Sequence, residues 1–182
     1  DELDVFPVNA LPGTMPILDF GAGHGTFVAG IVRQVDPEAR IVAYRALDTD
    51  GLASEKTLAC AMIRAAHEGA HVINVSAGME AVDGIIPPYL QTAVNYIQDL
   101  PIPPVIVASA GNNGTTEPVY PAAFEDVVAV AALRAGADRD PATGELPGAE
   151  WSSSGSWVDC SAVGEGIVST FVKGKEDLAR FG

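Results

Sequence analysis

The stretch VIVASAGNNG, residues 105–114, joins a mainly apolar run to a turn of glycine and asparagine. A continuous apolar run of this kind is typical of a strand buried in a parallel sheet. Glycine and asparagine suit the tight turn that follows, because both tolerate unusual backbone angles. In α/β folds, ligands bind beyond the carboxyl ends of such strands. The stretch therefore predicts a parallel sheet with a candidate site near Asn112.

Strands and helices alternate on both sides of this stretch. Further apolar runs predict strands or extended segments at residues 5–8, 41–46, 71–76, 127–132, 157–160 and 166–171. Helical spacing and capping residues predict helices from residue 24 to about 33, from 54 to about 69 and from 87 to about 99. The alternation predicts an α/β fold, with a mostly parallel sheet covered by helices on both faces.

The length and charge of the chain limit its organisation and its partners. Its 182 residues suffice for one domain, and its formal net charge is −14. Such a charge repels nucleic acid and anionic membranes. No apolar run approaches the roughly 20 residues of a membrane span. We therefore expect a single domain over residues 1–182, without a nucleic-acid or membrane partner.

Cysteines and acidic residues give no metal signal. Cys60 and Cys160 lack metal-type spacing, so we expect two buried thiols, and a single disulfide between them remains open. Residues 48–51, Asp-Thr-Asp-Gly, predict a turn before a helix. They fall far short of a full calcium-binding loop.

A second motif, GHGTFVAG at residues 23–30, places His24 at the start of a helix made of small residues. The positive end of a helix dipole disfavours the imidazolium form of a histidine at this position. A neutral imidazole is what a general base needs. The alternative is a histidine in the capping region of a tightly packed helix.

Small residues also follow the strand at 71–76. Ser76, Ala77 and Gly78 leave backbone groups exposed, to which an extended peptide can pair. At the end of the 105–109 run, the side-chain amide of Asn112 can donate a hydrogen bond to a developing oxyanion. The alternatives are an ordinary strand end and an ordinary Asn-Gly turn.

Taken together and in this order, the motifs resemble those of the subtilisin-like serine proteases. The histidine block at 23–30, the strand at 72–78 and the asparagine block at 108–114 carry the resemblance, and residues 120–132 and 151–170 agree with it. The resemblance implies that His24 is the general base and Asn112 the oxyanion-hole donor. It also implies that peptide substrate pairs with Ser76, Ala77 and Gly78, and that these residues and Ser109, Ala110 and Gly111 wall its pocket. The reaction in this family needs no cofactor.

Two blocks of the family pattern are missing from the chain. No strand ending in Asp-Thr/Ser-Gly precedes His24, since Asp19 lies in a loop, and no Gly-Thr-Ser block follows Thr170. We expect the chain to be the inactive central part of a protease domain. Strands 41–46 and 72–76 would then lack a shared neighbour, and re-pairing, a second copy or residues outside the chain would fill the gap.

Two other classes of function stand beside this one. A naturally non-catalytic peptide-binding relative would also lack the aspartate and serine blocks. An unrelated nucleotide-binding α/β domain is a weaker alternative, because no Gly-x-Gly-x-x-Gly follows a strand. Most proteases of this type are secreted, but the chain carries no address of its own.

Overall fold

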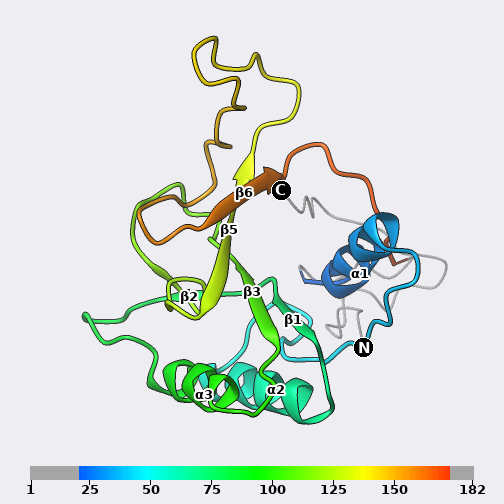
Figure 1. The fold of residues 1–182 in the computed structure, drawn as a ribbon, viewed down its shortest axis with the longest axis vertical. Helices are drawn as coiled ribbons and strands as arrows, with labels where there is room; N and C mark the ends of the chain where they lie inside the picture. The colour runs from blue at the N-terminus through cyan, green and yellow to red at the C-terminus, as the bar shows by residue number, and fades with distance from the viewer. Residues whose placement is uncertain (1–20, 173–182) are drawn as a thin grey trace, which may run out of the picture. The chain divides into compact units, whose positions relative to one another are not determined.

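The structure, a computed structural model, describes residues 21–172. The predicted run at 5–8 and Asp19 therefore lie outside the described residues. The chain divides into two compact units, one of residues 1–57 and 168–182 and the other of residues 58–167. Figure 1 shows the helices and strands of both.

The first unit contains helix α1, His24–Val35, which confirms the predicted helix. It begins after Gly23, whose φ of 82° is in the left-handed region. Ser169 Oγ donates a hydrogen bond to the carbonyl oxygen of Phe27 at 2.6 Å, and Thr170 Oγ1 donates one to Thr26 at 2.9 Å. A side chain at Gly30 would collide with both hydroxyls. The small residue at position 30 thus lets this segment lie directly on the helix.

Two predicted extended segments, which lie wholly or mostly in this unit, are not strands. Residues 41–46 and 166–171 take part in no sheet of the described chain. A strand is stable only when a neighbour satisfies its backbone groups, and no ladder reaches either segment. The predicted turn at 48–51 is confirmed, because the side chain of Asp48 accepts bonds from the N–H groups of Asp50 and Leu52.

The second unit is built on a parallel sheet in the order β1-β3-β5-β6. Its strands are β1 Val72–Val75, β3 Val105–Ser109, β5 Val127–Leu133 and β6 Cys160–Val163. A separate antiparallel pair joins β2 Met79–Glu80 to β4 Val119–Tyr120. The parallel order confirms the predicted class of fold. The last strand is displaced from its predicted position at 157–160, because the ladder with β5 begins only at Cys160.

Helices α2, Glu55–His67, and α3, Pro88–Gln98, confirm the other two predicted helices and lie side by side in Figure 1. Ser54 Oγ accepts a hydrogen bond from the N–H of Thr57 and so caps α2. Alternate side chains of the strands and the inner faces of the helices form the buried core: Leu58, Met62, Ala65, Ile73, Val75, Leu90, Val94, Ile97, Ile106, Ala108, Val127 and Ala129.

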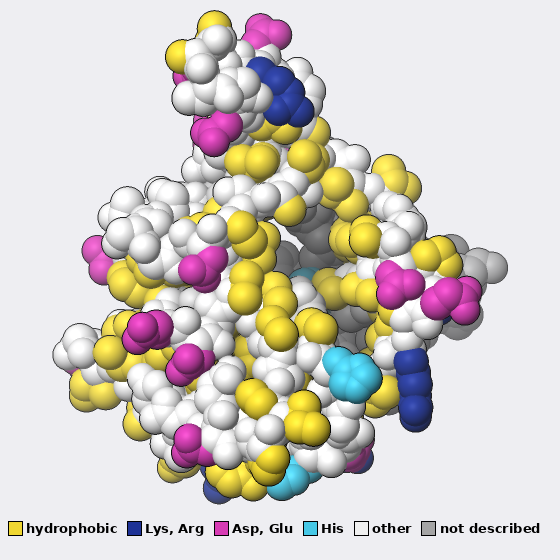
Figure 2. Space-filling view, in the orientation of Figure 1, with side chains coloured by type: hydrophobic (Ala, Val, Ile, Leu, Met, Phe, Trp, Pro, Cys, Tyr) yellow, Lys and Arg dark blue, Asp and Glu magenta, His cyan; other side chains and the backbone are white. Residues whose placement is uncertain are grey.

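The other face of the sheet is more open in the described residues. Val72 on β1 and Val105 on β3 are register partners, and they are 59% and 52% exposed. Figure 2 shows hydrophobic side chains gathered over these two strands. Apolar side chains at these positions suit a sheet face that a further layer can cover.

The prediction of buried thiols is wrong, because Cys60 and Cys160 are both free and exposed. Cys60 follows the buried Ala59 by one residue and so lies one step away from the inner face of α2. Cys160 lies on β6, all of whose residues are exposed. In a helix, one residue turns a side chain by about 100°, enough to move it out of the core.

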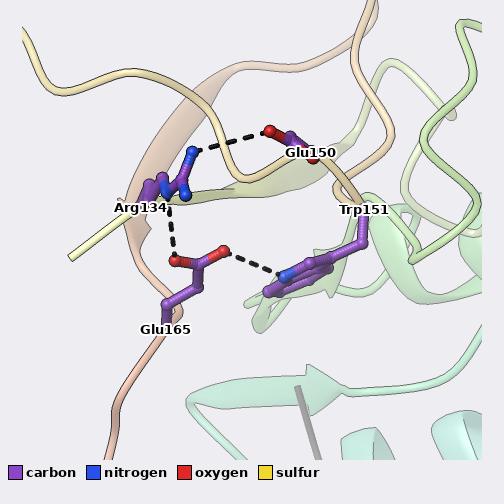
Figure 3. Close-up of polar contacts among 4 residues, drawn as sticks. All are labelled: Arg134, Glu150, Trp151 and Glu165. Carbon is purple, nitrogen blue, oxygen red and sulfur yellow. Dashed lines mark hydrogen bonds and ion pairs between the residues drawn. The ribbon is translucent and has the colours of Figure 1, made fainter. Parts of the chain in front are cut away.

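The loop at 134–150 projects from the sheet and is fixed at its base by polar contacts. Arg134 contacts Glu150 at 3.5 Å and Glu165 at 3.9 Å, and Trp151 Nε1 donates a hydrogen bond to Glu165 at 3.2 Å (Figure 3). Farther out, backbone N–H groups of Thr143 and Ala142 hold the pKa of the Asp140 carboxyl below its ordinary value. The base of the loop therefore joins the end of β5 to the residues around β6.

Across residues 21–172, no helix is long and apolar enough to cross a membrane. The same residues contain no cluster of three histidine, cysteine or carboxylate side chains that could hold a metal ion.

The core assignment predicts effects of different size for two isoleucines. Ile97 on α3 is fully buried, whereas Ile102 is 88% exposed. Ile97→Ala should lower the free energy of unfolding by about 2–5 kcal/mol, because it leaves a cavity in the core. Ile102→Ala should change it by less than about 0.5 kcal/mol. Urea denaturation of both variants measures the difference, and equal effects would contradict the core described above.

Candidate functional site

The candidate substrate segments follow adjacent parallel strands. β1 pairs with β3 in a register that ends with Val75 beside Ala108. Both strands therefore end at the same edge of the sheet. β1 continues into Ser76, Ala77 and Gly78, and β3 continues into Ala110 and Gly111. Asn74 Nδ2 donates a hydrogen bond to Ser76 Oγ at 2.9 Å. The sheet thus brings together the two segments that the sequence predicts to bind a peptide.

A single buried side chain, Val119, lies between these segments. A Cβ built on Gly78 would come within 2.6 Å of one Val119 methyl group. A Cβ built on Gly111 would lie 3.0 Å from the other methyl group. Both glycines are therefore needed for the close approach of their backbones to β4. Nothing in the sequence around Val119 indicated this role, because the contact with Gly78 joins residues far apart in the chain.

The asparagine turn, residues 111–114, follows β3 directly. Its glycine ends have left-handed backbone angles, with φ of 97° at Gly111 and 62° at Gly114. Asn112 is exposed at the turn, and among residues 21–172 the structure shows no hydrogen bond to its side chain. An exposed side-chain amide beside the two candidate segments is able to donate a hydrogen bond to a carbonyl oxygen placed there.

Backbone hydrogen bonds to β5 and to segment 151–153 hold this turn in place. Ala110 N–H donates to the carbonyl oxygen of Val130 at 2.9 Å, which continues the pairing of β3 with β5. Ser153 N–H donates to Gly111 at 2.9 Å, and Gly114 N–H donates to Trp151 at 2.9 Å. Segment 151–153 therefore supports both ends of the turn.

His24 lies at the first position of α1 and is half-buried. An open hollow of about 500 Å³ lies along the same helix. Its lining is mostly apolar and consists of Gly25, Thr26, Ala29, Gly30, Arg33, Gln34, Ala43 and Thr170. His24 belongs to the first unit of the chain, and Asn112 and the peptide-binding segments belong to the second. The structure thus brings the six residues that the sequence predicts to bind substrate together with Asn112 within one unit, and describes His24 within the other.

Comparison with known proteins identifies the class of this chain. A sequence profile of the Subtilase family matches residues 7–179. The chain is therefore a member of the subtilase family of serine proteases. The expectation drawn from the histidine, strand and asparagine blocks is confirmed at the level of the family.

Individual relatives agree with this assignment. The chain is 40% identical over 157 residues to the thermophilic serine proteinase of Bacillus sp. (strain AK1), covering 81% of this chain and 35% of that protein. It is 35% identical over 161 residues to thermitase of Thermoactinomyces vulgaris, covering 83% of this chain and 52% of thermitase. The chain thus spans about half or less of these relatives.

Solved structures show the same fold. Sphericase superimposes with a TM-score of 0.63 at 28% identity, covering 87% of this chain and 59% of its own. A lanthipeptide protease superimposes with a TM-score of 0.65 at 26% identity, covering 83% of this chain and 46% of its own. The α/β fold with its parallel sheet is that of subtilisin-like proteins.

The close approach at Gly111 yields a stability prediction. Gly111→Ala should lower the free energy of unfolding by about 1–3 kcal/mol, because alanine is strained at this φ and its methyl group meets Val119. Gly148→Ala is the matched control in the same unit, since no positive φ applies there and its nearest neighbour is 4.0 Å away. Thermal or urea denaturation compares the two, and equal stability of both variants would contradict the packing at Gly111.

Proposed function

We propose that this chain is the central part of a subtilisin-like serine endopeptidase domain. In this proposal His24 is the general base, Asn112 is the oxyanion-hole donor, and the substrate is a peptide or protein. The full-length protein supplies the aspartate and the serine nucleophile, so residues 1–182 alone are inactive. No cofactor takes part.

One observation carries the proposal. The segments after β1 and β3 leave the sheet at one edge and lie on either side of Val119, with Asn112 next to them. A peptide that pairs with the backbone of Ser76, Ala77 and Gly78 can then place a carbonyl group toward the asparagine turn. The pocket for the residue before the scissile bond lies between these segments, against Ser109, Ala110 and Gly111.

The residues divide the chemistry between them. His24 takes the proton from the serine hydroxyl as it attacks the peptide carbonyl, and returns it to the leaving amine. The Asn112 amide donates to the oxyanion that forms on the carbonyl oxygen. Water then releases the acyl group by the same route.

A relative supports a role outside the cell, and the net charge argues against nucleic-acid and anionic-membrane partners. The chain carries a net charge of −14, and one relative at 33% identity is a minor extracellular protease of Bacillus subtilis. We therefore propose a secreted protease that binds neither nucleic acid nor membrane.

Active-site labelling of the full-length protein tests this proposal. A fluorophosphonate probe should label the full-length protein and should not label residues 1–182 alone. His24→Ala should abolish labelling and peptide hydrolysis. Asn112→Ala should lower kcat by about 10²- to 10³-fold with little change in KM, because the donor acts on the transition state.

His71→Ala is the control, because His71 is an exposed histidine just before β1. It should leave both labelling and hydrolysis unchanged. If the full-length protein binds peptides but is neither labelled nor active, the proposal of an enzyme is wrong and the protein is a peptide-binding module.

The open edge of the sheet supports a second, separate proposal about the isolated chain. Among the described strands, β1 pairs only with β3, so its other edge presents unpaired backbone groups. Such an edge is a template for a strand of another molecule. We propose that residues 1–182 self-associate through β1.

A charge on this edge strand should prevent the association. Val72→Lys should keep the chain monomeric at concentrations where the unchanged chain forms dimers in sedimentation experiments, because an edge lysine opposes strand pairing. Val105→Lys is the control, since Val105 is the register partner of Val72 but β3 has neighbours on both sides. A chain that stays monomeric at every concentration would count against the proposal, as would equal effects of both variants.

A further inference from the structure

We propose that Glu80 and Ser153 are positioning residues that clamp the asparagine turn from its two sides and so hold the amide of Asn112 in place. The inference rests on the proposed function for the role of Asn112. The clamp itself rests on contacts of the turn that the sequence does not indicate.

Ser153 forms the inner side of the clamp. It is fully buried, although serine is usually exposed, so its polar groups need partners. Its N–H donates to Gly111 at 2.9 Å, and its hydroxyl oxygen accepts a bond from the N–H of Asn113 at 3.3 Å. One buried residue thus contacts the backbone on both sides of Asn112.

Segment 151–153 is itself well supported, which makes Ser153 a firm anchor. Ser152 Oγ accepts a bond from the N–H of Ala132 on β5 at 2.9 Å. The Trp151 ring donates to Glu165, which also contacts Arg134 (Figure 3). The inner side of the clamp is therefore attached to the sheet.

Glu80 forms the outer side. Its Oε1 accepts a hydrogen bond from Asn113 Nδ2 at 2.6 Å, a short distance that fits a charge-assisted bond. Glu80 lies on β2, where it pairs with Val119 of β4. The bond joins residues 33 positions apart and ties the turn to the strand that continues from Gly78.

The turn needs such a clamp because glycine stands at both of its ends. Gly111 and Gly114 carry no Cβ to restrict their backbone, so the chain at both ends of the turn has the conformational freedom of glycine. A donor contributes to catalysis only when it is already aimed at the developing charge. Holding Asn113 on two sides restricts the backbone of the preceding residue, Asn112. The side-chain amide of Asn112 takes no part in these contacts.

The same arrangement couples the turn to peptide binding. A peptide paired with residues 76–78 fixes the chain that leads into β2, and β2 carries Glu80. The carboxylate then holds Asn113 while the peptide carbonyl faces Asn112. Removing Glu80 should therefore affect the chemical step more than the binding of substrate.

Kinetics of the full-length protein test the clamp. Glu80→Ala should lower kcat about fivefold with KM changed less than twofold, because it removes one exposed hydrogen bond. Glu80→Gln should restore kcat to within about twofold, since its amide oxygen can accept the same bond. Asn113→Ala combined with Glu80→Ala should cost no more than either change alone, because both remove one interaction.

Glu117→Ala is the matched control, since Glu117 is an exposed carboxylate on the chain that follows the turn. It should leave kcat unchanged. The clamp is overturned if Glu80→Ala behaves like Glu117→Ala, if Glu80→Gln fails to restore kcat, or if only KM changes.

Amide hydrogen exchange separates this inference from the proposed function. The N–H groups of Asn113 and Gly114 are bonded to segment 151–153, and Glu80→Ala should speed their exchange about fivefold, with no change in the core strands. If the protein is inactive but these amides respond, the clamp stands and the proposed function fails. Unchanged exchange overturns the clamp whatever the activity.

Discussion

Parallel pairing of β1, β3 and β5 is the constraint on which the candidate site depends. Parallel strands present all their carboxyl ends at one edge, and the register places Val75, Ala108 and Ala129 in one row across the sheet. Residues 76–78 and 110–114 must therefore leave the sheet next to each other. A shift of one residue would invert the faces of the strand and remove Ile106 or Ile73 from the core. The core thus fixes the register, and the register fixes the site.

The sequence predicts those parts of the fold that local pattern determines. Apolar runs with turn residues at their ends located β1, β3 and β5, and helical spacing located the helices, with Ser54 marking the start of α2 and Pro88 the start of α3. The prediction at 41–46 failed because strand formation requires a neighbour, and apolar composition says nothing about which neighbour is present. The prediction that Cys60 is buried was wrong for a geometric reason, since an apolar residue in an amphipathic helix is buried only when it lies on the inner face.

The candidate site divides in the same way. Short motifs at strand ends contain Ser76, Gly78, Gly111 and Asn112. In an α/β fold, ligands bind at such strand ends, so these residues could be predicted as site residues. Val119, Glu80 and Ser153 stand in no motif. Each of the three contacts a residue that lies 33 to 42 positions away in the chain. Such contacts arise only when β2, β4 and segment 151–153 are folded against one another. No pattern of neighbouring residues encodes them.

These long-range contacts resolve a conflict within the asparagine turn. Gly111 and Gly114 permit the tight backbone path that exposes Asn112. They also increase the conformational freedom of the backbone, in the unfolded and in the folded chain. A donor that moves freely must be ordered when the transition state forms, which reduces its benefit. Burying the Ser153 hydroxyl under the turn orders it beforehand, and the desolvation of that hydroxyl is offset by its bond to Asn113. The outer bond to Glu80 is exposed, so water competes with it, and the buried contacts of Ser153 supply the firmer side of the proposed clamp.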